Sequence, residues 1–165
     1  MGMKEISNMR KNAGFTTVEL FITIAIVGIL SVIGIPNFLV WRANSKLIGT
    51  SHNLRGDLEK AKMKAIRENA RVAVVFTATG YTIFIDNGAG GGTADNWIQD
   101  GSEILLRNRQ MVPGIAIDLA ATTFAADRTR FDGRGLPGVL GRVVIAGSTG
   151  TRQIVMNRLG RLNVQ

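Results

Sequence analysis

The sequence contains no cysteine among its 165 residues, and it has only one histidine and three prolines. A chain without cysteine has no disulfide scaffold, no thiolate nucleophile, no thiolate zinc site and no iron–sulfur cluster. One histidine excludes a multi-histidine metal centre. Hydrophobic residues make up 45% of the chain and charged residues 19%, which favours a packed core over intrinsic disorder. The net charge of +8 is compatible with an anionic partner but does not identify one.

A long apolar segment lies near the N-terminus. The 22 residues at positions 20–41 carry no charged side chain. As a helix they would be about 33 Å long, against about 30 Å for the hydrocarbon core of a membrane. The residues before them include Lys4, Arg10 and Lys11 against Glu5. The positive-inside tendency therefore predicts a single-pass protein whose N-terminus is cytoplasmic. A plain membrane anchor is the simplest interpretation.

Four residues do not suit a plain anchor. Glu19 places a carboxylate at the start of the apolar segment, where a charge costs about 2.5–3.5 kcal/mol on insertion scales. Gly28 and Gly34 loosen the helix and permit close approach of another helix. Pro36 removes a backbone donor and favours a kink or a melted turn.

Residues 11–20, with the sequence KNAGFTTVEL, resemble the type III signal of prepilins. That signal is a short basic leader ending in glycine, followed by phenylalanine, with glutamate fifth in the mature chain. The resemblance implies cleavage between Gly14 and Phe15 by a membrane prepilin peptidase, and N-methylation of the new Phe15 amine. It also implies that Glu19 faces the Phe15 ammonium of a neighbouring subunit. Such a pair neutralises two charges that are costly in lipid.

Residues 42–71 keep a helical pattern but become polar. Their apolar and small residues recur at spacings of three and four and form one stripe: Leu47, Ser51, Leu54, Leu58, Ala61 and Ala65. Charged residues, Asp57 among them, are assigned to the other faces. We expect the membrane helix to continue to about Asn69, with the stripe packed against a globular domain. A coiled coil is the weaker alternative, because the stripe is short and its side chains are small.

After Arg71 the pattern changes to short apolar runs separated by turn residues. Strands are predicted at residues 72–78, 81–85, 104–106, 115–117, 129–131, 143–146 and 153–156, with an edge strand within 159–164. Residues 143–156 are predicted to form a hairpin. The prediction is an α+β fold: a leader at 1–14, the membrane half of a long helix at 15–41, its amphipathic half at 42–71, and an antiparallel β domain at 72–165.

The C-terminal region resembles the H-type pseudopilins of type II secretion and the FimT/FimU-like minor pilins, the GspH/FimT family. The matching segments are the helix end at 67–71, FIDN at 84–87 with the Gly-rich loop after it, DGSEILLR at 100–107, FDGRG at 131–135 and LGR at 159–161. The resemblance implies a pilin helix packed on a periplasmic domain. It also implies a bacterial inner-membrane subunit that polymerises with other pilins or pseudopilins on an assembly platform. A major pilin is the nearest alternative, and the extended β region argues against it.

The same resemblance implies a place near the fibre tip, where the subunit helps to initiate or cap assembly. The chain has no nucleotide-binding motif, so a separate ATPase would supply the energy. The sequence GRGLPG at 133–138 matches G-x-G-x-x-G, but Pro137 denies it the following helix, so we predict a turn. His52 has no nucleophile arrangement around it. We therefore expect a protein that is not an enzyme and has no cofactor.

Two ligands are weighed against a structural role for the residues concerned. Oxygen-bearing side chains that could bind Ca²⁺ are Asp86, Asn87, Asp95, Asp100 and Glu103, but the alternating spacing of a calcium loop is missing and a polar loop is favoured. Arg152, Arg158 and Arg161 could contact DNA. Some FimT-like minor pilins that bind DNA during natural transformation carry a G-R-x-R tail, whereas here Asn163 replaces the second arginine. A DNA-binding minor pilin is thus the alternative function.

Overall fold

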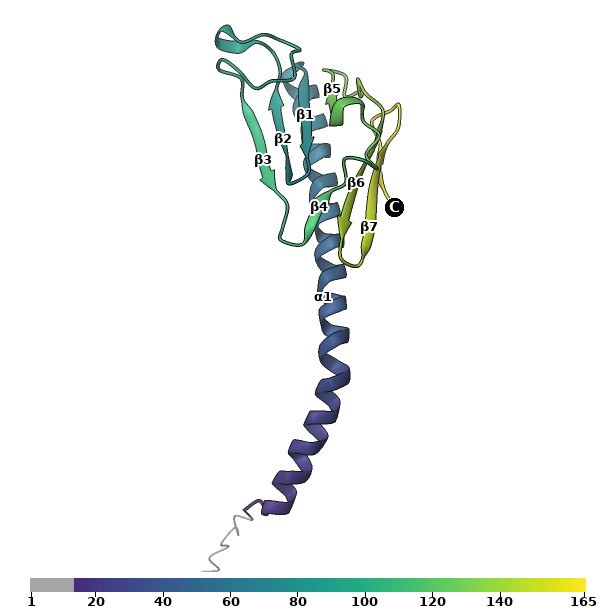
Figure 1. The fold of residues 1–165 in the computed structure, drawn as a ribbon. Coiled ribbons are helices and arrows are strands. Elements are labelled where there is room, and N and C mark those ends of the chain that lie inside the picture. The colour runs from purple at the N-terminus through teal and green to yellow at the C-terminus, as the bar shows by residue number, and fades with distance from the viewer. Residues whose placement is uncertain (1–13) are drawn as a thin grey trace, which may run out of the picture. The chain divides into compact units, whose positions relative to one another are not determined.

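The computed structural model describes residues 14–165. The chain separates into two compact units, Met1–Leu39 and Val40–Gln165. One helix, α1 (Thr17–Glu68), begins in the first unit and ends in the second, and strands β1 to β8 follow it along the chain (Figure 1).

Local hydrogen bonds define the start of α1. The Thr16 hydroxyl oxygen accepts a hydrogen bond from the Glu19 backbone N–H at 3.2 Å, which makes Thr16 the N-cap. Glu19 lies in the first turn, where the positive end of the helix dipole favours a carboxylate. The hydroxyls of Thr23 and Ser31 donate to the carbonyl oxygens of Glu19 and Val27 at 2.6 and 2.7 Å. These polar side chains therefore need no partner outside the helix.

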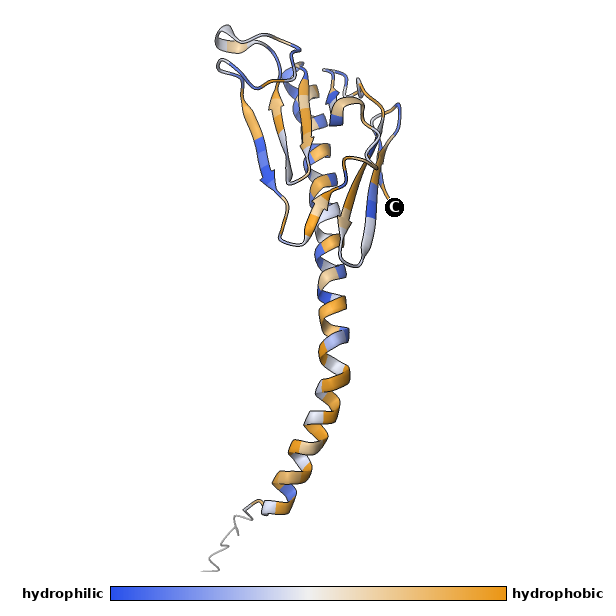
Figure 2. Ribbon diagram, viewed as in Figure 1, coloured by the Kyte–Doolittle hydropathy of each residue, from blue (hydrophilic) through white to orange (hydrophobic). Residues whose placement is uncertain are grey.

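The first unit leaves its apolar side chains uncovered. Exposed large hydrophobic residues follow one another from Phe15, which is 84% exposed, to Leu39. Figure 2 colours most of this part of α1 as hydrophobic. In the part of the chain that the structure describes, α1 is the one helix long and apolar enough to cross a membrane. Lipid, or another apolar surface, is the environment in which such a surface is stable.

The stripe predicted on the second part of α1 is confirmed. Its six members are all buried: Leu47, Ser51, Leu54, Leu58, Ala61 and Ala65. The assignment of Asp57 to a polar face is wrong, because this residue is also buried, with 4% of its surface exposed. Position 57 comes three residues after Leu54 and four before Ala61, so the helical period places it on the stripe.

Helix α1 ends in a Schellman motif. The backbone N–H of Ala70 donates to the Ala65 carbonyl at 3.1 Å, and that of Asn69 donates to the Ile66 carbonyl at 3.3 Å. Asn69 has a φ of 46°, the left-handed conformation that this motif needs and that asparagine tolerates. The chain then enters the first strand directly.

Eight strands form two antiparallel four-stranded sheets. The first sheet has the order β3-β2-β1-β5, with β1 at Val72–Thr77, β2 at Gly80–Ile85, β3 at Leu105–Gln110 and β5 at Arg128–Phe131. The second has the order β4-β6-β7-β8, with β4 at Ile115–Ile117, β6 at Gly141–Gly147, β7 at Gly150–Met156 and β8 at Leu162–Val164. Two short 3-10 turns, Ala89–Gly91 and Ala125–Asp127, lie in the connections. The predicted α+β fold is confirmed.

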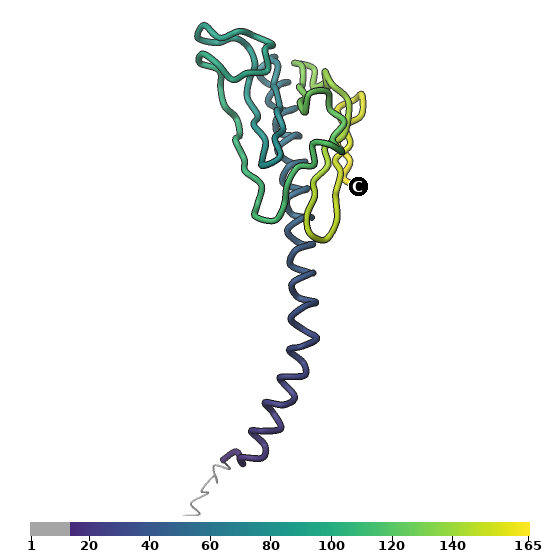
Figure 3. The backbone as a smooth tube through the Cα atoms, viewed as in Figure 1, coloured from purple at the N-terminus to yellow at the C-terminus, as the bar shows by residue number. Residues whose placement is uncertain are grey.

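All eight predicted strands are present, and β3 is longer than predicted. The predicted hairpin is formed by β6 and β7, with Gly147 opposite Gly150 (Figure 3). Strand β3 was expected to end at Leu106, but it continues to Gln110 and includes Arg107 and Arg109. It pairs with β2 and forms an edge of its sheet, where polar side chains are common. A polar edge strand has no apolar run by which the sequence would reveal it.

The main hydrophobic core lies between α1 and the two sheets. It joins the buried stripe of α1 to Val74, Ile83 and Phe131 of the first sheet, and to Ile145 and Ile154 of the second. All of these residues belong to the second unit. One helix face therefore holds both sheets in a single folded domain.

Candidate functional site

The segment that resembles a prepilin signal is open at its predicted cleavage point. Gly14 and Phe15 precede α1 in non-helical conformation and are exposed. A Cβ atom built on Gly14 would meet nothing within 4 Å. The rest of the predicted leader, residues 1–13, lies outside the described residues. A protease can therefore reach the bond between Gly14 and Phe15 without displacing any described part of the chain.

The residues predicted to govern assembly lie along the same exposed helix. Glu19 is exposed in the first turn. Gly28 and Gly34 would each accept a Cβ with nothing within 4 Å, which leaves room for a neighbouring helix. The chain stays helical through Pro36. The kink or melting predicted at Gly28, Gly34 and Pro36 stays a prediction.

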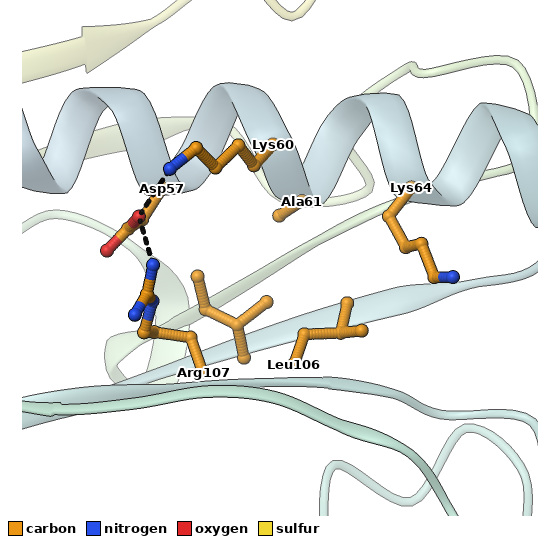
Figure 4. A pocket seen from close by; sticks show the side chains of 7 residues that line it. Asp57, Lys60, Ala61, Lys64, Leu106 and Arg107 are labelled. Carbon is orange, nitrogen blue, oxygen red and sulfur yellow. Dashed lines mark hydrogen bonds and ion pairs between the residues drawn. The ribbon is translucent and has the colours of Figure 1, made fainter.

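The second unit contains a charged pocket between α1 and β3, which we call the Asp57 pocket. It encloses about 180 Å³ and is lined by Asp57, Lys60, Ala61, Lys64, Ile83, Leu106 and Arg107. Figure 4 shows the side chains of Lys60 and Arg107 directed at Asp57 from opposite walls of the pocket. Lys60 and Arg107 thus both pair with the one buried carboxylate of Asp57.

Asp57 is the centre of an ion and hydrogen-bond network. Its Oδ2 accepts a 2.7 Å hydrogen bond from the Tyr81 hydroxyl and lies 3.5 Å from Arg109 Nε. Its Oδ1 lies 3.4 Å from a guanidinium nitrogen of Arg107 and 3.7 Å from Lys60 Nζ. Burial, followed by the hydrogen bond and the negative charge of Asp57, raises the pKa of Tyr81. The sequence analysis missed this network, although the helical period could have placed Asp57 in it.

The G-x-G-x-x-G sequence forms a turn, as predicted. Asp132 Oδ1 accepts hydrogen bonds from the backbone N–H groups of Arg134 and Leu136 at 2.9 and 2.8 Å. Burial opposes ionisation of Asp132, but these hydrogen bonds and the Arg134 guanidinium outweigh it and lower the pKa of that carboxyl. Gly135 has a φ of 77°, a conformation that glycine adopts without strain. This is a structural turn at the end of the domain.

The three candidate DNA-binding arginines do not form one cluster. Arg158 and Arg161 are exposed in the turn between β7 and β8, and Arg152 lies in β7 near the opposite end of that strand. Four strand residues separate Arg152 from the end of β7, or about 13 Å. Arg161 instead lines a groove with Arg55 and Lys62 of α1. Lys62 Nζ donates to the carbonyl oxygens of Leu159 and Gly160 at 3.2 and 3.1 Å, which fixes the turn on the helix.

The side chains of the five candidate calcium ligands are bound to backbone N–H groups and arginines in and around their own loop. Asp86 accepts from the backbone N–H groups of Asp95 and Trp97, Asp100 from that of Thr93, Glu103 from those of Gly88 and Asp100, and Asn87 from that of Ala89. Asp95 pairs with Arg71 and Arg130. Among the described residues, no three His, Cys, Asp or Glu side chains converge on a metal site. The oxygens are used as anchors for backbone N–H groups and arginines.

Aromatic and basic residues close the same loop onto β5. The guanidinium carbons of Arg128 and Arg130 each lie 4.8 Å from the ring centroid of Trp97. Arg128 and Arg130 are two residues apart in β5, so their side chains lie on the same face of the strand. Such cation–π contacts contribute about 0.5–1 kcal/mol each at partly exposed sites. Arg130 therefore makes a cation–π contact with Trp97 and an ion pair with Asp95.

Comparison with known proteins identifies the group to which this architecture belongs. The profile of the family described as "Type II transport protein GspH" matches residues 50–160. The chain belongs to the GspH family. The matched region contains the end of α1, the Asp57 pocket and nearly all of both sheets. Membership and fold together make this GspH-family protein a structural subunit of a pilus or pseudopilus, which associates with other pilins in a fibre.

Two crystal structures of the type IV minor pilin FimU from Pseudomonas aeruginosa strain PAO1 share the fold. Their TM-scores are 0.53 and 0.51, with 14% identity, and they match 76% and 72% of this chain and 92% of FimU. The type IV major pilin protein PilA of Myxococcus xanthus strain DK1622 is 49% identical over 45 residues. That match covers 27% of this chain, and the chain spans only a fifth (20%) of the length of that relative.

The family assignment agrees with the exposed apolar helix, which fits a membrane-anchored pilin. Proteins of the pilin family are generally structural rather than enzymatic. The prediction of a GspH- or FimU-type minor pilin is therefore confirmed.

Proposed function

We propose that this chain is a minor pilin or pseudopilin that lies near the tip of its fibre and helps to initiate or cap assembly for protein secretion. The observation that carries the proposal is the sequence from Gly14 to Glu19 at the start of an exposed apolar helix, in a GspH-family protein. The fibre is a type II secretion pseudopilus or a type IV pilus. Its subunit is inserted in the inner membrane with its N-terminus in the cytoplasm and its β domain in the periplasm.

Maturation follows from the same segment. A prepilin peptidase cleaves between Gly14 and Phe15 and methylates the Phe15 amine. Extraction from the membrane onto an assembly platform then buries α1 among the helices of other subunits. This replaces lipid with protein around the apolar surface, and small residues such as Gly28 permit close packing.

Glu19 sets the register of the incoming subunit. Its carboxylate is costly in lipid, and so is the Phe15 ammonium of the adjacent subunit. Pairing of the two charges removes both costs and can occur only when the helices are aligned. The Thr16 N-cap fixes the backbone of Glu19 in the first turn of α1, where the helix dipole favours its carboxylate.

We expect Glu19→Ala to lower incorporation into fibres by at least about tenfold, because an unpaired ammonium in lipid costs about 2.5–3.5 kcal/mol. Cleavage after Gly14 should be unchanged. The measurement is the ratio of this protein in sheared fibres to that in membranes, by immunoblot. Glu59→Ala is the matched control, since Glu59 is an exposed carboxylate on the same helix and does not line the Asp57 pocket. Normal incorporation of Glu19→Ala would contradict the pairing.

DNA binding is a second candidate, favoured by the groove that Arg161 lines with Arg55 and Lys62. Glu59 also lines this groove and pairs with Arg55 at 3.0 Å, which reduces its positive charge. The solubilised full-length protein should then retard duplex DNA at low salt. Arg158→Ala with Arg161→Ala should weaken retardation and reduce the salt slope by roughly two, one for each phosphate contact. Arg152→Ala is the matched control because it lies toward the other end of β7. The absence of any retardation at low salt would rule out this function.

A further inference from the structure

The Asp57 pocket contains more positive than negative charge. Two cations of its lining, Lys60 and Arg107, lie within 3.7 Å of the Asp57 carboxylate, and Arg109, outside the lining, lies 3.5 Å from it. Lys64, which like Lys60 lies on the α1 side of the pocket, forms an ion pair with Glu68 at 2.7 Å. The single negative charge of Asp57 is thus shared among three cations, and its Oδ2 also accepts the hydrogen bond from the Tyr81 hydroxyl. The distances of 3.4 Å for Arg107 and 3.7 Å for Lys60 are longer than the 2.7–2.9 Å of a charge-assisted hydrogen bond.

The shape of the pocket suits a single acidic side chain. Ala61, Ile83 and Leu106 supply apolar walls, and the cationic groups of Lys60 and Arg107 lie beside them. The pocket, of about 180 Å³, is larger than the space that one water molecule needs, so it has room for a side chain. The Lys60 side chain is 73% exposed, so the charged side of the pocket is open to solvent. Strand β3 is the edge of its sheet, which leaves this side accessible to another chain.

We propose that the Asp57 pocket receives a glutamate or aspartate side chain from a neighbouring pilin-like subunit of the fibre. The incoming carboxylate accepts hydrogen bonds from Lys60 and Arg107, and its methylene groups contact Ala61 and Leu106. Asp57 keeps its ion pair with Arg107 and continues to accept the hydrogen bond from the Tyr81 hydroxyl. This inference rests on the role as a fibre subunit. It adds a polar contact between periplasmic domains to the packing of the apolar helices.

The chemistry argues for an acidic side chain rather than a phosphate of a nucleic acid. A phosphodiester has no apolar stem to cover Ala61, Ile83 and Leu106. A glutamate side chain presents methylene groups and a carboxylate together. Complementary charge at such a contact selects the partner and fixes its orientation.

Zero-length carbodiimide coupling tests this contact directly, because it joins a lysine amine to a carboxylate only where the two touch. Fibres that contain the full-length protein are treated, and the linked peptides are identified by mass spectrometry. We expect an amide between Lys60 and an acidic residue of another pilin-like subunit. Lys60→Arg should remove this product, because a guanidinium does not form the amide. Lys46→Arg, which alters an exposed lysine on the same helix, should leave the product unchanged.

Charge reversal gives a second readout. Lys60→Glu should lower incorporation roughly tenfold, and replacement of the identified partner carboxylate by lysine should restore it. Fibres that contain the wild-type chain without a Lys60 product, or with Lys60 joined only to Asp57, would overturn the inference. Normal incorporation of Lys60→Glu would also overturn it. Absence of the wild-type chain from fibres would instead contradict the proposed function, and the inference with it.

Discussion

Asp57→Leu is expected to lower the free energy of unfolding of the folded domain by about 2–4 kcal/mol. The Tyr81 hydroxyl, in a side chain that is almost fully buried, would lose its acceptor. Arg107 and Arg109 would both lose the carboxylate with which they pair. Loss of one partner from a buried pair costs about 3–5 kcal/mol. The two arginines are partly exposed and can turn toward water, which reduces the cost.

The measurement is urea-induced unfolding of a fragment spanning residues 40–165, which contains the whole hydrophobic core. Glu59→Leu is a matched control, because it removes a carboxylate two positions along the same helix. Glu59 pairs with Arg55 on an exposed face at 3.0 Å, so its loss should cost less than about 0.5 kcal/mol. Equal effects of the two substitutions would show that Asp57 has no special role in the domain.

Adding Tyr81→Phe to Asp57→Leu should recover part of the lost free energy of unfolding, because no hydroxyl then needs an acceptor.

Tyr81 is the one tyrosine in the sequence, so the absorbance of tyrosinate reports on its ionisation alone. Burial and Asp57 raise its pKa in the folded state above the ordinary value of about 10. The folded state therefore holds this proton more tightly than the unfolded state. The stabilisation is complete below about pH 10 and is lost as the pH rises further, and unfolding should accompany ionisation.

The sequence predicted those parts of the fold in which local pattern and tertiary packing agree. The stripe from Leu47 to Ala65 is buried because its period matches the helix, and the β6–β7 hairpin follows from two apolar runs around a glycine turn. Residue type alone assigns Asp57 to an exposed face, and the structure shows that its position decides instead. The period alone assigns it to the stripe between Leu54 and Ala61.

The division into two sheets could not be predicted from local pattern. Strand β5 pairs with β1 across more than fifty residues, and β4 pairs with β6 rather than with the preceding β3. Such pairings depend on which side chains meet over the helix, and no nearby residue specifies them. The Asp57 pocket depends on the same step. Lys60 and Arg107 are distant in sequence and converge only after β3 has taken its place at the sheet edge.

Gly14→Val is expected to block maturation, with a fall of roughly a hundredfold in the rate of cleavage before Phe15. A Cβ at this position meets nothing within 4 Å, so the substitution leaves the described structure undisturbed. The effect must therefore arise in the active site of the peptidase, where small displacements of the scissile bond are costly. Immunoblots should show a precursor about 1.5 kDa heavier than the mature protein, since the leader stays attached.

The uncut chain also tests how maturation and assembly are linked. Phe15 would have no free amine, so it could be neither methylated nor paired with Glu19 of a neighbour, and incorporation should fall as it does in Glu19→Ala. Gly28→Val is the matched control, because it makes the same change at another glycine with nothing within 4 Å. It should be cleaved normally, with methylated Phe15 as the first residue by mass spectrometry. Cleavage of Gly14→Val at the wild-type rate would show that the peptidase does not recognise this glycine.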